Sequence, residues 1–358
     1  MRLEKVLKEM QKRQLTHLII NDPSSIDYLI NYKNNPGERM YLLLLSSDGH
    51  HKLFMNNLFY LDHKLDIEQV WYSDTDNYLQ LLADEFDGAC SIGIDKNFPA
   101  RFLIPLMNLV DECHFELGSE CVDRVRMIKD EKEQQLMIEA SKINDLVVDE
   151  VINICAKGNL TEEEVSKQLE GIYQKHGCVG NSFEPIVAYG KNGADNHHSG
   201  DDSRLKAGDS IVIDIGGLYK GYCSDMTRTV FYKEVSPKQK TVYELVLKAQ
   251  KAAEAMIKPG VRLCDIDKCA RDIIAEGGYT VEFNHRLGHF IGRDVHEWCD
   301  VSQNFDLEVQ EGMTFSIEPG VYLQGEFGVR IEDLVLVTKD GCKVLNSYPK
   351  DLRIIGND

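Results

Sequence analysis

The stretch Ser-Ile-Val-Ile-Asp-Ile-Gly-Gly at residues 210–217 has the apolar run of a buried strand, yet it carries an acid, Asp214, inside that run. A second stretch, Gly-Tyr-Cys-Ser-Asp-Met-Thr-Arg-Thr-Val at residues 221–230, likewise places Asp225 beside strand-forming residues. A soluble protein usually has aliphatic residues at such positions. The pattern therefore predicts two carboxylates in the interior of the fold.

Two further acids repeat this pattern near the C-terminal end of the chain. Glu318 lies in Met-Thr-Phe-Ser-Ile-Glu-Pro-Gly-Val-Tyr at residues 313–322, and Glu332 lies in Phe-Gly-Val-Arg-Ile-Glu-Asp-Leu-Val-Leu-Val at residues 327–337. A lone ionised carboxylate in such surroundings costs several kcal/mol, so each acid needs a partner. The simplest partner that all four acids can share is a pair of divalent metal ions.

The spacing predicts that the acids face one another in pairs. A two-residue hairpin turn at Tyr219–Lys220 would set the first two acids opposite each other, and a turn centred on Gly325 would do so for the second two. Directly opposed residues share one face of a sheet, with Cβ atoms about 5 Å apart. Two such hairpins suit a dinuclear site, in which the metal ions lie about 3.5–4 Å apart.

Length and composition limit the classes of protein to consider. A chain of 358 residues predicts two domains, with three as the alternative, and a net charge of −19 argues against nucleic acid or an anionic membrane as the main partner. The ten cysteines include no Cys-x-x-Cys pair, which is typical of a reduced, cytoplasmic protein. The charged N-terminus does not resemble a signal peptide, and no stretch approaches about 20 uninterrupted apolar residues, so we expect no membrane span.

Strands and helices alternate in the first third of the chain, which predicts an α/β domain. The charged segment at 124–133 marks the boundary, placed between residues 124 and 125, and a long helix follows to about residue 156. The second domain contains two hairpins with opposed acids, which suggests internal duplication. The elements expected are helices at 1–14, 24–31, 76–86, 98–110, 162–176 (with Thr161 as N-cap), 237–257 and 263–276, and strands at 17–21, 41–46, 52–55 and 91–95.

A histidine, His289, stands between the two acid hairpins in the sequence. A single histidine is more often a structural residue, but neutral imidazole is also the commonest nitrogen ligand of catalytic metals. Four carboxylates and one histidine suit Mn²⁺, Co²⁺ or Fe²⁺ better than a thiolate-type zinc site. The polar segment 192–198, which carries two histidines, is on its residues alone a solvated turn.

The order Asp, Asp, His, Glu, Glu with these flanks resembles the "pita-bread" metallopeptidases, which include methionine aminopeptidase, aminopeptidase P and prolidase. The N-terminal domain resembles the creatinase-type domain of prolidases and aminopeptidases P, which methionine aminopeptidases lack. The motifs that carry the resemblance are Asp-Ile-Gly-Gly (214–217), Cys-Ser-Asp-Met-Thr-Arg-Thr (223–229), Gly-His-Phe-Ile-Gly (288–292), Val-His-Glu (295–297), Phe-Ser-Ile-Glu-Pro-Gly-Val-Tyr (315–322) and Gly-Val-Arg-Ile-Glu-Asp (328–333).

This resemblance implies an α+β protein. Residues 125–358 are expected to form a pita-bread catalytic domain, an internally duplicated and curved antiparallel sheet covered by helices. Residues 1–124 are expected to form a creatinase-like α/β domain. The resemblance further implies a homodimer.

The resemblance also implies a ligand set. Asp214 would bind one metal ion, Asp225 and Glu332 would bridge two, and His289 and Glu318 would bind the second. The cofactor expected is two divalent metal ions per subunit, with manganese first and cobalt, iron or zinc as alternatives.

Catalytic and substrate-binding roles follow from the same resemblance. Glu318 would transfer a proton, and His296 and His197 would lie beside the scissile amide, while His285 and Arg330 would line the substrate site. Asn196, where the family often has proline, leaves the choice between His197 and His198 open.

Phe290 also departs from the family, which commonly has glycine after the metal-binding histidine. A bulky ring at this position predicts a narrowed or reshaped pocket, with consequences for substrate preference and not for metal binding.

The activity implied is that of an exopeptidase which hydrolyses the bond before proline, through attack on the scissile carbonyl by a water that two metal ions deprotonate. An Xaa-Pro dipeptidase (prolidase) acting on small peptides with proline second is the leading prediction. Aminopeptidase P, which accepts longer peptides, is the close alternative, and a non-catalytic binding protein on this fold is a third. A cation placed to bind the free carboxylate of a dipeptide would discriminate the first two, and Arg286, Arg330 or a residue of a partner subunit are the alternatives for it.

Overall fold

The computed structural model describes residues 2–61 and 63–357, and the chain folds into two compact units that divide between Arg126 and Met127. The sequence-based boundary between residues 124 and 125 lies within helix α5 (Glu120–Arg126). In the part of the chain that the structure describes, no helix has both the length and the apolar character that a membrane span requires.

The first unit contains a mixed six-stranded sheet in the order β4-β3-β2-β1-β5-β6. Its central strand β1 (His17–Ile20) pairs antiparallel with β2 and parallel with β5. Leu18 and Ile20 pack into one core and Ile19 into a second, so apolar layers cover both faces of the sheet. The other elements are α1 (Arg2–Lys12), α2 (Pro23–Ile30), β2 (Leu42–Ser46), β3 (Lys52–Asn56), β4 (Glu68–Tyr72), α3 (Tyr78–Ala83), β5 (Ser91–Ile94), α4 (Ala100–Leu109) and β6 (His114–Leu117).

The helices and strands expected in this unit are confirmed, but two of its strands are not among the expected elements. β4 and β6 lie at the two edges of the sheet. Their sequences, Glu-Gln-Val-Trp-Tyr and His-Phe-Glu-Leu, contain few fully buried positions, so they lack the continuous apolar run that marks an inner strand.

The second unit consists of two halves of similar construction, each with two helices followed by antiparallel strands. In the first half, α6 (Glu131–Ala156) and α7 (Glu162–Lys175) start at capping boxes, with Asp130 and Thr161 as N-caps, which confirms the predicted cap at Thr161. The elements that follow are β7 (Ile186–Tyr189), the 3₁₀ helix η1 (Gly190–Ala194), β8 (Ser210–Ile215), β9 (Leu218–Tyr219), β10 (Tyr222–Cys223) and β11 (Met226–Tyr232).

The second half repeats this order, again from the predicted helices. Ser236 caps α8 (Pro237–Met256), and α9 (Leu263–Glu276) follows. The strands are β12 (Gly288–Phe290), β13 (Glu297–Val301), β14 (Thr314–Ile317), β15 (Gly320–Leu323), β16 (Phe327–Arg330), β17 (Asp333–Val337) and β18 (Cys342–Val344), and β19 (Ile354–Ile355) returns to pair with β11 of the first half.

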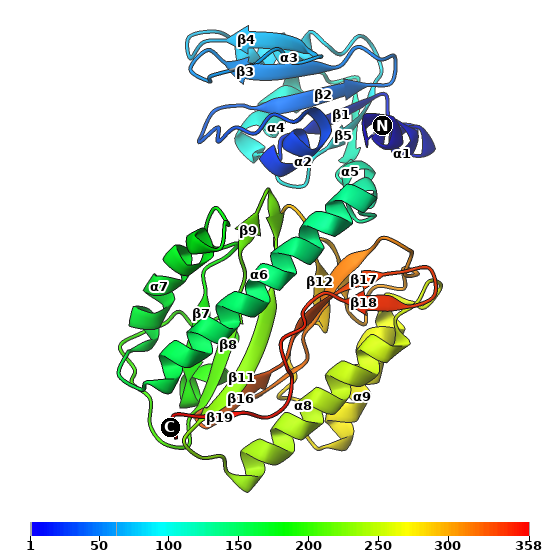
Figure 1. The fold of residues 1–358 in the computed structure, drawn as a ribbon. Coiled ribbons are helices and arrows are strands. Elements are labelled where there is room, and N and C mark those ends of the chain that lie inside the picture. The colour runs from blue at the N-terminus through cyan, green and yellow to red at the C-terminus, as the bar shows by residue number, and fades with distance from the viewer. Residues whose placement is uncertain (1, 62, 358) are drawn as a thin grey trace. The chain divides into compact units, whose positions relative to one another are not determined.

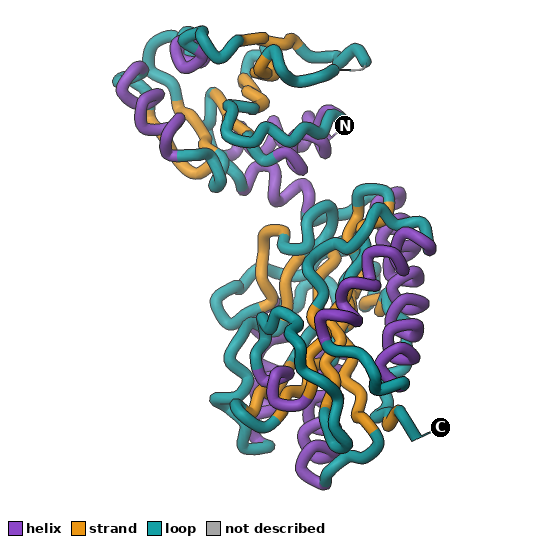
Figure 2. Tube along the Cα trace, turned by 90° about the vertical axis from the view of Figure 1, so that its left-hand side faces the viewer, coloured by secondary structure: helices purple, strands orange, loops and turns teal. Residues whose placement is uncertain are grey.

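Helices cover one side of the strands in the second unit, as Figures 1 and 2 show. α6 and α7 share an apolar core with β7, β8 and β11. α8 and α9 share a second core with β12, β14 and β17. The expected α+β architecture, with an internally duplicated antiparallel sheet under helices, is therefore confirmed.

The register of the second hairpin agrees with the prediction. Leu323 pairs with Phe327 around the turn at Gly325, and Ile317 pairs with Asp333 farther along. Glu318 and Glu332 fall between these pairs in the same register, on one face.

The predicted register of the first hairpin is wrong. The turn residues are Lys220 and Gly221, which both have positive φ, and Tyr219 pairs with Tyr222. Asp214 therefore lies opposite Thr227 and not opposite Asp225. Glycine tolerates the left-handed backbone that the second turn position needs, and the prediction overlooked this preference. A shift of two residues preserves the face, so both acids still point the same way.

Candidate active site

A cavity of about 850 Å³ opens over the strands of the second unit. Both halves of this unit contribute to its walls, and most of the histidines singled out in the sequence border it. Its lining includes Ser182–Ile186, Asn196–Ser199, Asp214, Asp225, His285, Arg286, His289, Val295, His296, Glu318, Tyr322, Arg330 and Glu332.

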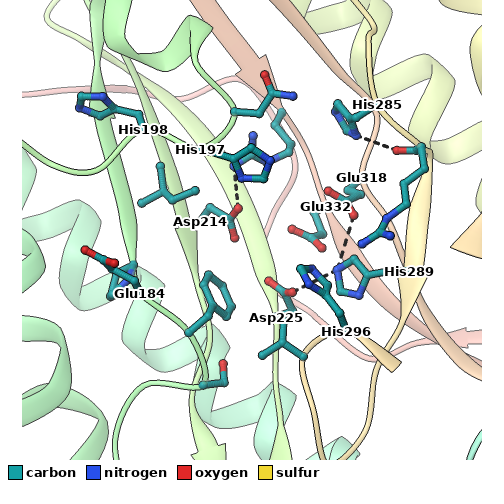
Figure 3. A pocket seen from close by; sticks show the side chains of 18 of the residues that line it. Glu184, His197, His198, Asp214, Asp225, His285, His289, His296, Glu318 and Glu332 are labelled. Carbon is teal, nitrogen blue, oxygen red and sulfur yellow. Dashed lines mark hydrogen bonds and ion pairs between the residues drawn. The ribbon is translucent and has the colours of Figure 1, made fainter. Parts of the chain in front are cut away.

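The five ligands predicted from the sequence come together in this cavity (Figure 3). The His289 Nε2 atom lies 3.5 Å from Asp225 Oδ2 and 3.5 Å from Glu318 Oε1. Ligand atoms of Asp225, His289 and Glu332 all lie within 4.8 Å of one another. Asp214 extends from β8 toward the same space.

Hydrogen bonds orient the imidazole of His289 toward the acids. Its Nδ1 donates to the carbonyl oxygen of Phe290 at 3.2 Å, which leaves the Nε2 lone pair facing Asp225 and Glu318. The backbone N–H of His289 donates to Ser316 Oγ at 3.0 Å, and that hydroxyl donates to Glu318 Oε1 at 3.1 Å. An imidazole fixed in this way presents the nitrogen that a metal ion uses.

The acids perturb one another strongly. Burial raises the pKa of Asp225 and of Glu332 well above the ordinary range, and repulsion from neighbouring acids adds to this effect. Burial also raises the pKa of Glu318 to about 7. Carboxyl groups in such surroundings are costly to ionise unless a cation is present.

One protein cation does reach the cluster. Arg330, which is 3% exposed, donates from Nη2 to Asp214 Oδ2 at 2.6 Å and from Nε to Thr227 Oγ1 at 3.1 Å. Arg228, the other arginine near the acids in sequence, pairs with Asp333 at 2.7 Å instead. The ion pair therefore accounts for Asp214. The Arg330 charge also acts on Asp225 and Glu318, but among the described residues no arginine or lysine forms an ion pair with Asp225, Glu318 or Glu332.

Two carboxylate oxygens without hydrogen-bond partners indicate that this cluster of acids can accept metal ions. Asp214 Oδ1 and Asp225 Oδ1 are buried, and neither has a hydrogen-bond partner among residues 2–61 and 63–357. Buried carboxylate oxygens normally have partners, so these two are available as ligands. Together with His289 Nε2 and the other carboxylates they form a hard donor set that suits divalent cations such as Mn²⁺.

A chain of hydrogen bonds supports the wall of the cavity beside Arg330. Arg330 Nη1 donates to the Tyr322 hydroxyl at 2.9 Å, and this hydroxyl donates to His285 Nε2 at 3.0 Å. His285 Nδ1 in turn donates to the Arg286 carbonyl at 2.7 Å, which fixes the tautomer. Burial and the nearby Arg330 charge lower the pKa of His285 to about 3, so the ring is neutral.

His296 and His197 border the cluster on two sides (Figure 3). The His296 ring lies edge-on to that of His289, with ring centroids 4.4 Å apart. Burial lowers the pKa of His296 to about 4, and the charge of Arg286 acts in the same direction. A neutral imidazole at this position can donate a hydrogen bond to a substrate.

The structure separates the two histidines of the 192–198 segment. His198 Nε2 lies 2.6 Å from Oε2 of Glu162, a buried residue at the start of α7, so its ring is engaged away from the acid cluster. His197 lies nearer to Asp214 (Figure 3). Both histidines line the cavity, but only the ring of His198 is held by Glu162.

The predicted effect of Phe290 on the pocket is wrong. Its side chain is fully buried in the core under α8 and α9, with its ring centroid 5.2 Å from that of Phe315. His289 lines the cavity, whereas the next residue, Phe290, packs in the core and is not among the lining residues. The ring therefore does not narrow the cavity.

Three residues that sequence reasoning did not single out contact the predicted ones. Thr227 donates to Glu332 Oε2 at 2.7 Å, Ser316 bonds Glu318, and Tyr322 joins Arg330 to His285. Two of them share a face with a predicted ligand at a spacing of two residues, Thr227 with Asp225 and Ser316 with Glu318. That alternation is the signal that would have identified these two.

Comparisons with known proteins agree with this geometry. The family model "Metallopeptidase family M24" matches residues 135–339, and "Creatinase/Prolidase N-terminal domain" matches residues 2–128. A Staphylococcus aureus protein named "Uncharacterized peptidase SAS1635" is 33% identical over 358 residues, which cover 98% of this chain and 99% of that protein.

Solved structures with similar folds extend over nearly the whole chain. The recombinant prolidase from Thermococcus sibiricus is 32% identical, with a TM-score of 0.92, and the match covers 99% of this chain and 98% of that one. The dipeptidase PepE from Mycobacterium ulcerans is 31% identical, with a TM-score of 0.92 and coverage of 99% and 97%. The chain therefore belongs to metallopeptidase family M24, and it is a hydrolase with a pita-bread catalytic unit and a creatinase/prolidase-type N-terminal domain.

Proposed function

We propose that this protein is a dinuclear metal-dependent exopeptidase that hydrolyses the bond before proline, and specifically that it is an Xaa-Pro dipeptidase. The observation that carries the proposal is the cluster of buried acids around His289 Nε2, with two carboxylate oxygens that lack partners among the described residues. The printed names of the similar proteins, a prolidase and a dipeptidase, support the substrate class.

In this proposal two divalent ions bind to five residues. Manganese suits the oxygen-rich donor set, and cobalt, iron or zinc are alternatives. When bound, such ions acidify a water molecule and polarise a carbonyl oxygen. The ligands proposed are Asp214, Asp225, His289, Glu318 and Glu332.

The residues around the metal ligands would handle protons and orient the substrate. Glu318 would take a proton from the attacking water and return it to the leaving nitrogen. His296 and His197 would donate hydrogen bonds to the amide and to the oxygen on which charge develops. A leaving proline has no N–H, so the site needs no acceptor for one.

Arg286 is the residue that we propose to bind the free carboxylate of a dipeptide. Arg330 is committed to Asp214, Thr227 and Tyr322, so it would shape the substrate site together with His285. The side chain of Arg286 lines the cavity, is 33% exposed and forms an ion pair with Asp300 at 2.6 Å. Its guanidinium retains N–H groups for a bidentate bond to a second carboxylate.

Two further features of the proposal concern the whole protein. The ten cysteines are free thiols, which is consistent with a reducing, cytoplasmic location. We also propose a homodimer, for which the family resemblance is the support.

The experiment uses chelator-stripped protein reloaded with Mn²⁺ and the matched substrates Ala-Pro and Ala-Pro-Ala. Cleavage of mainly Ala-Pro is expected, and Arg286→Met should raise KM for Ala-Pro at least about 10-fold, because a charge-assisted bidentate pair is lost. Arg293→Met, outside the residues that line the cavity, is the control. Cleavage of mainly Ala-Pro-Ala would instead make the protein an aminopeptidase P, and cleavage of neither substrate by metal-loaded protein would exclude both.

A further inference from the structure

A second group of polar residues lies beside the active site and takes no part in the ligand set. At its centre is the carboxylate of Glu162, the first residue of helix α7, which is fully buried. Its Oε1 accepts from the backbone N–H of Tyr189 at 2.6 Å and from Asn192 Nδ2 at 3.0 Å. Its Oε2 accepts from the backbone N–H of Asp201 at 3.1 Å and lies 2.6 Å from His198 Nε2.

These partners all belong to one segment, residues 189–203, which contains η1 and the loop that follows it. The first residues of α7 hold the far end of this segment as well. The backbone N–H of Glu162 donates to the Ser203 carbonyl at 3.3 Å, and that of Glu163 donates to the Asp201 carbonyl at 3.1 Å. The segment is thus wrapped around the N-terminus of a helix and a single buried side chain.

His197 lies between two anchors of this segment. On one side, Gln324 Nε2 donates to the Ala194 carbonyl at 2.7 Å, which attaches η1 to the hairpin of β15 and β16. On the other side, Glu162 holds the next residue, His198. His197 itself, between these anchors, is exposed. Its backbone N–H donates to Asp195 Oδ1 of the same loop at 3.0 Å.

We propose that Glu162 is a positioning residue for catalysis: it holds the 189–203 segment so that His197 faces the substrate, and it acts through His197 without touching the substrate. The inference rests on the proposed function in one respect, since it assumes that His197 takes part in the reaction.

A metal ion is the competing explanation, because Glu162, His198 and Asp201 each offer a ligand atom within 4.8 Å of the others. The hydrogen bonds argue against it. Three of the partners of Glu162 are N–H donors, two backbone amides and one side-chain amide, which occupy both of its oxygens. A carboxylate already surrounded by N–H groups has little capacity left for a cation.

Glu162→Gln is the variant that tests the role of Glu162. The side chains have the same shape, but the amide NH₂ would replace one oxygen and would then face donors in either orientation. We expect the variant to fold, to loosen the 189–203 segment and to lower kcat by up to about 100-fold, the cost of misplacing a catalytic group by about 1 Å. Glu163→Gln removes the same charge at the next, exposed position and is the matched control.

A double-mutant cycle with His197→Ala separates positioning from a general structural effect. If Glu162 acts through His197, then Glu162→Gln lowers kcat in the wild-type background and has no further effect when His197 is already absent. Multiplicative losses in the double variant would overturn the inference. His198→Phe, which removes one partner of Glu162 while retaining the acid, should reproduce the kcat loss in smaller degree and serves if Glu162→Gln does not fold.

Hydrogen exchange provides a readout that needs no activity. Peptides covering residues 189–203 should exchange faster in Glu162→Gln than in wild type, while α9 peptides stay unchanged; equal exchange of 189–203 would overturn the inference. Metal analysis should give two ions per chain in both proteins, and a third ion lost with Glu162 would favour the metal explanation. If wild-type protein cleaves no Xaa-Pro peptide, the proposed function fails, and exchange alone then decides the role of Glu162.

Discussion

The acids of the candidate active site lie so close together that their negative charges would repel one another. Asp225 and Glu332 are almost fully buried beside other carboxyl groups, and their pKa values are raised well above the ordinary range. Such an arrangement weakens the metal-free fold and strengthens the binding of cations, because a divalent ion removes the repulsion. Neutralising one acid should therefore maintain or raise the stability of the metal-free protein and lower its affinity for metal ions.

Replacing Asp225 by Asn tests this opposition. We expect the variant to lose metal and to lose activity by more than the roughly 100-fold that changes to residues around metal ligands cost. Its metal-free form should melt at the same temperature as metal-free wild type or higher, because a repelling charge has gone. Calorimetry with and without Mn²⁺ measures both effects, and Asp306→Asn, at an exposed position, is the control. Full activity in chelated buffer would contradict the ligand assignment.

The Tyr322 hydroxyl is a second test at the residue scale. It links Arg330, which holds Asp214, to His285 in the cavity wall. Tyr322→Phe should lower metal affinity or kcat about 10- to 100-fold while leaving the fold intact, since only the orientation of these groups changes. Tyr243→Phe, whose hydroxyl donates to the Lys350 carbonyl elsewhere, is the matched control. If Tyr322→Phe and Tyr243→Phe have equal metal affinity and equal kcat, then the Tyr322 hydroxyl does not help to orient the metal-binding residues.

Among the structural elements, the hairpins determine which side chains meet. The prediction for the first hairpin missed the register by two residues, yet it placed Asp214 and Asp225 on the correct face, because faces repeat every two residues. Acids inside apolar runs are conspicuous in a sequence. Tyr322 is an ordinary strand residue, and its contacts depend on a register that turn geometry decides, so the sequence did not identify it.

Phe290 shows a related limit of sequence reasoning. It directly follows the predicted ligand His289 in the sequence, but its side chain packs in the core, which adjacency in the sequence does not reveal. The helices were more predictable, because their capping residues and helical periodicity are local properties of the sequence. The edge strands β4 and β6 were not predictable in this way, since pairing with the rest of the sheet defines them.

Close contact between β12 and β14 gives a prediction at the element scale. A Cβ atom on Gly288 would lie 1.9 Å from the carbonyl oxygen of Ser316, the residue whose hydroxyl bonds both His289 and Glu318. Gly288→Ala should therefore separate the strands, cost about 1–3 kcal/mol of unfolding free energy and weaken metal binding. Urea denaturation and Mn²⁺ titration measure these changes. Gly171→Ala in α7, with open space at the Cβ position, should be neutral or stabilising.

For the whole second unit, metal content should change how stability depends on pH. The pKa of Glu318 is raised from its ordinary 4.5 to about 7 in the folded protein. A raised folded-state pKa gives stability that is complete below the unfolded value and is lost as pH rises through the folded value. The melting temperature of metal-free protein should therefore fall between about pH 5 and pH 7, and saturating Mn²⁺ should reverse the fall. Parallel pH profiles with and without metal would contradict this.

The five proposed ligands come from both halves of the second unit, which has a consequence for synthesis of the chain. Asp214 and Asp225 precede α8, whereas His289, Glu318 and Glu332 follow α9. During translation the first two acids leave the ribosome more than sixty residues before the first nitrogen ligand and more than ninety before the next acid. A nascent chain released before residue 332 is complete lacks part of the ligand set. If the proposed ligand set is right, tight binding of metal ions requires that both halves have been made and joined.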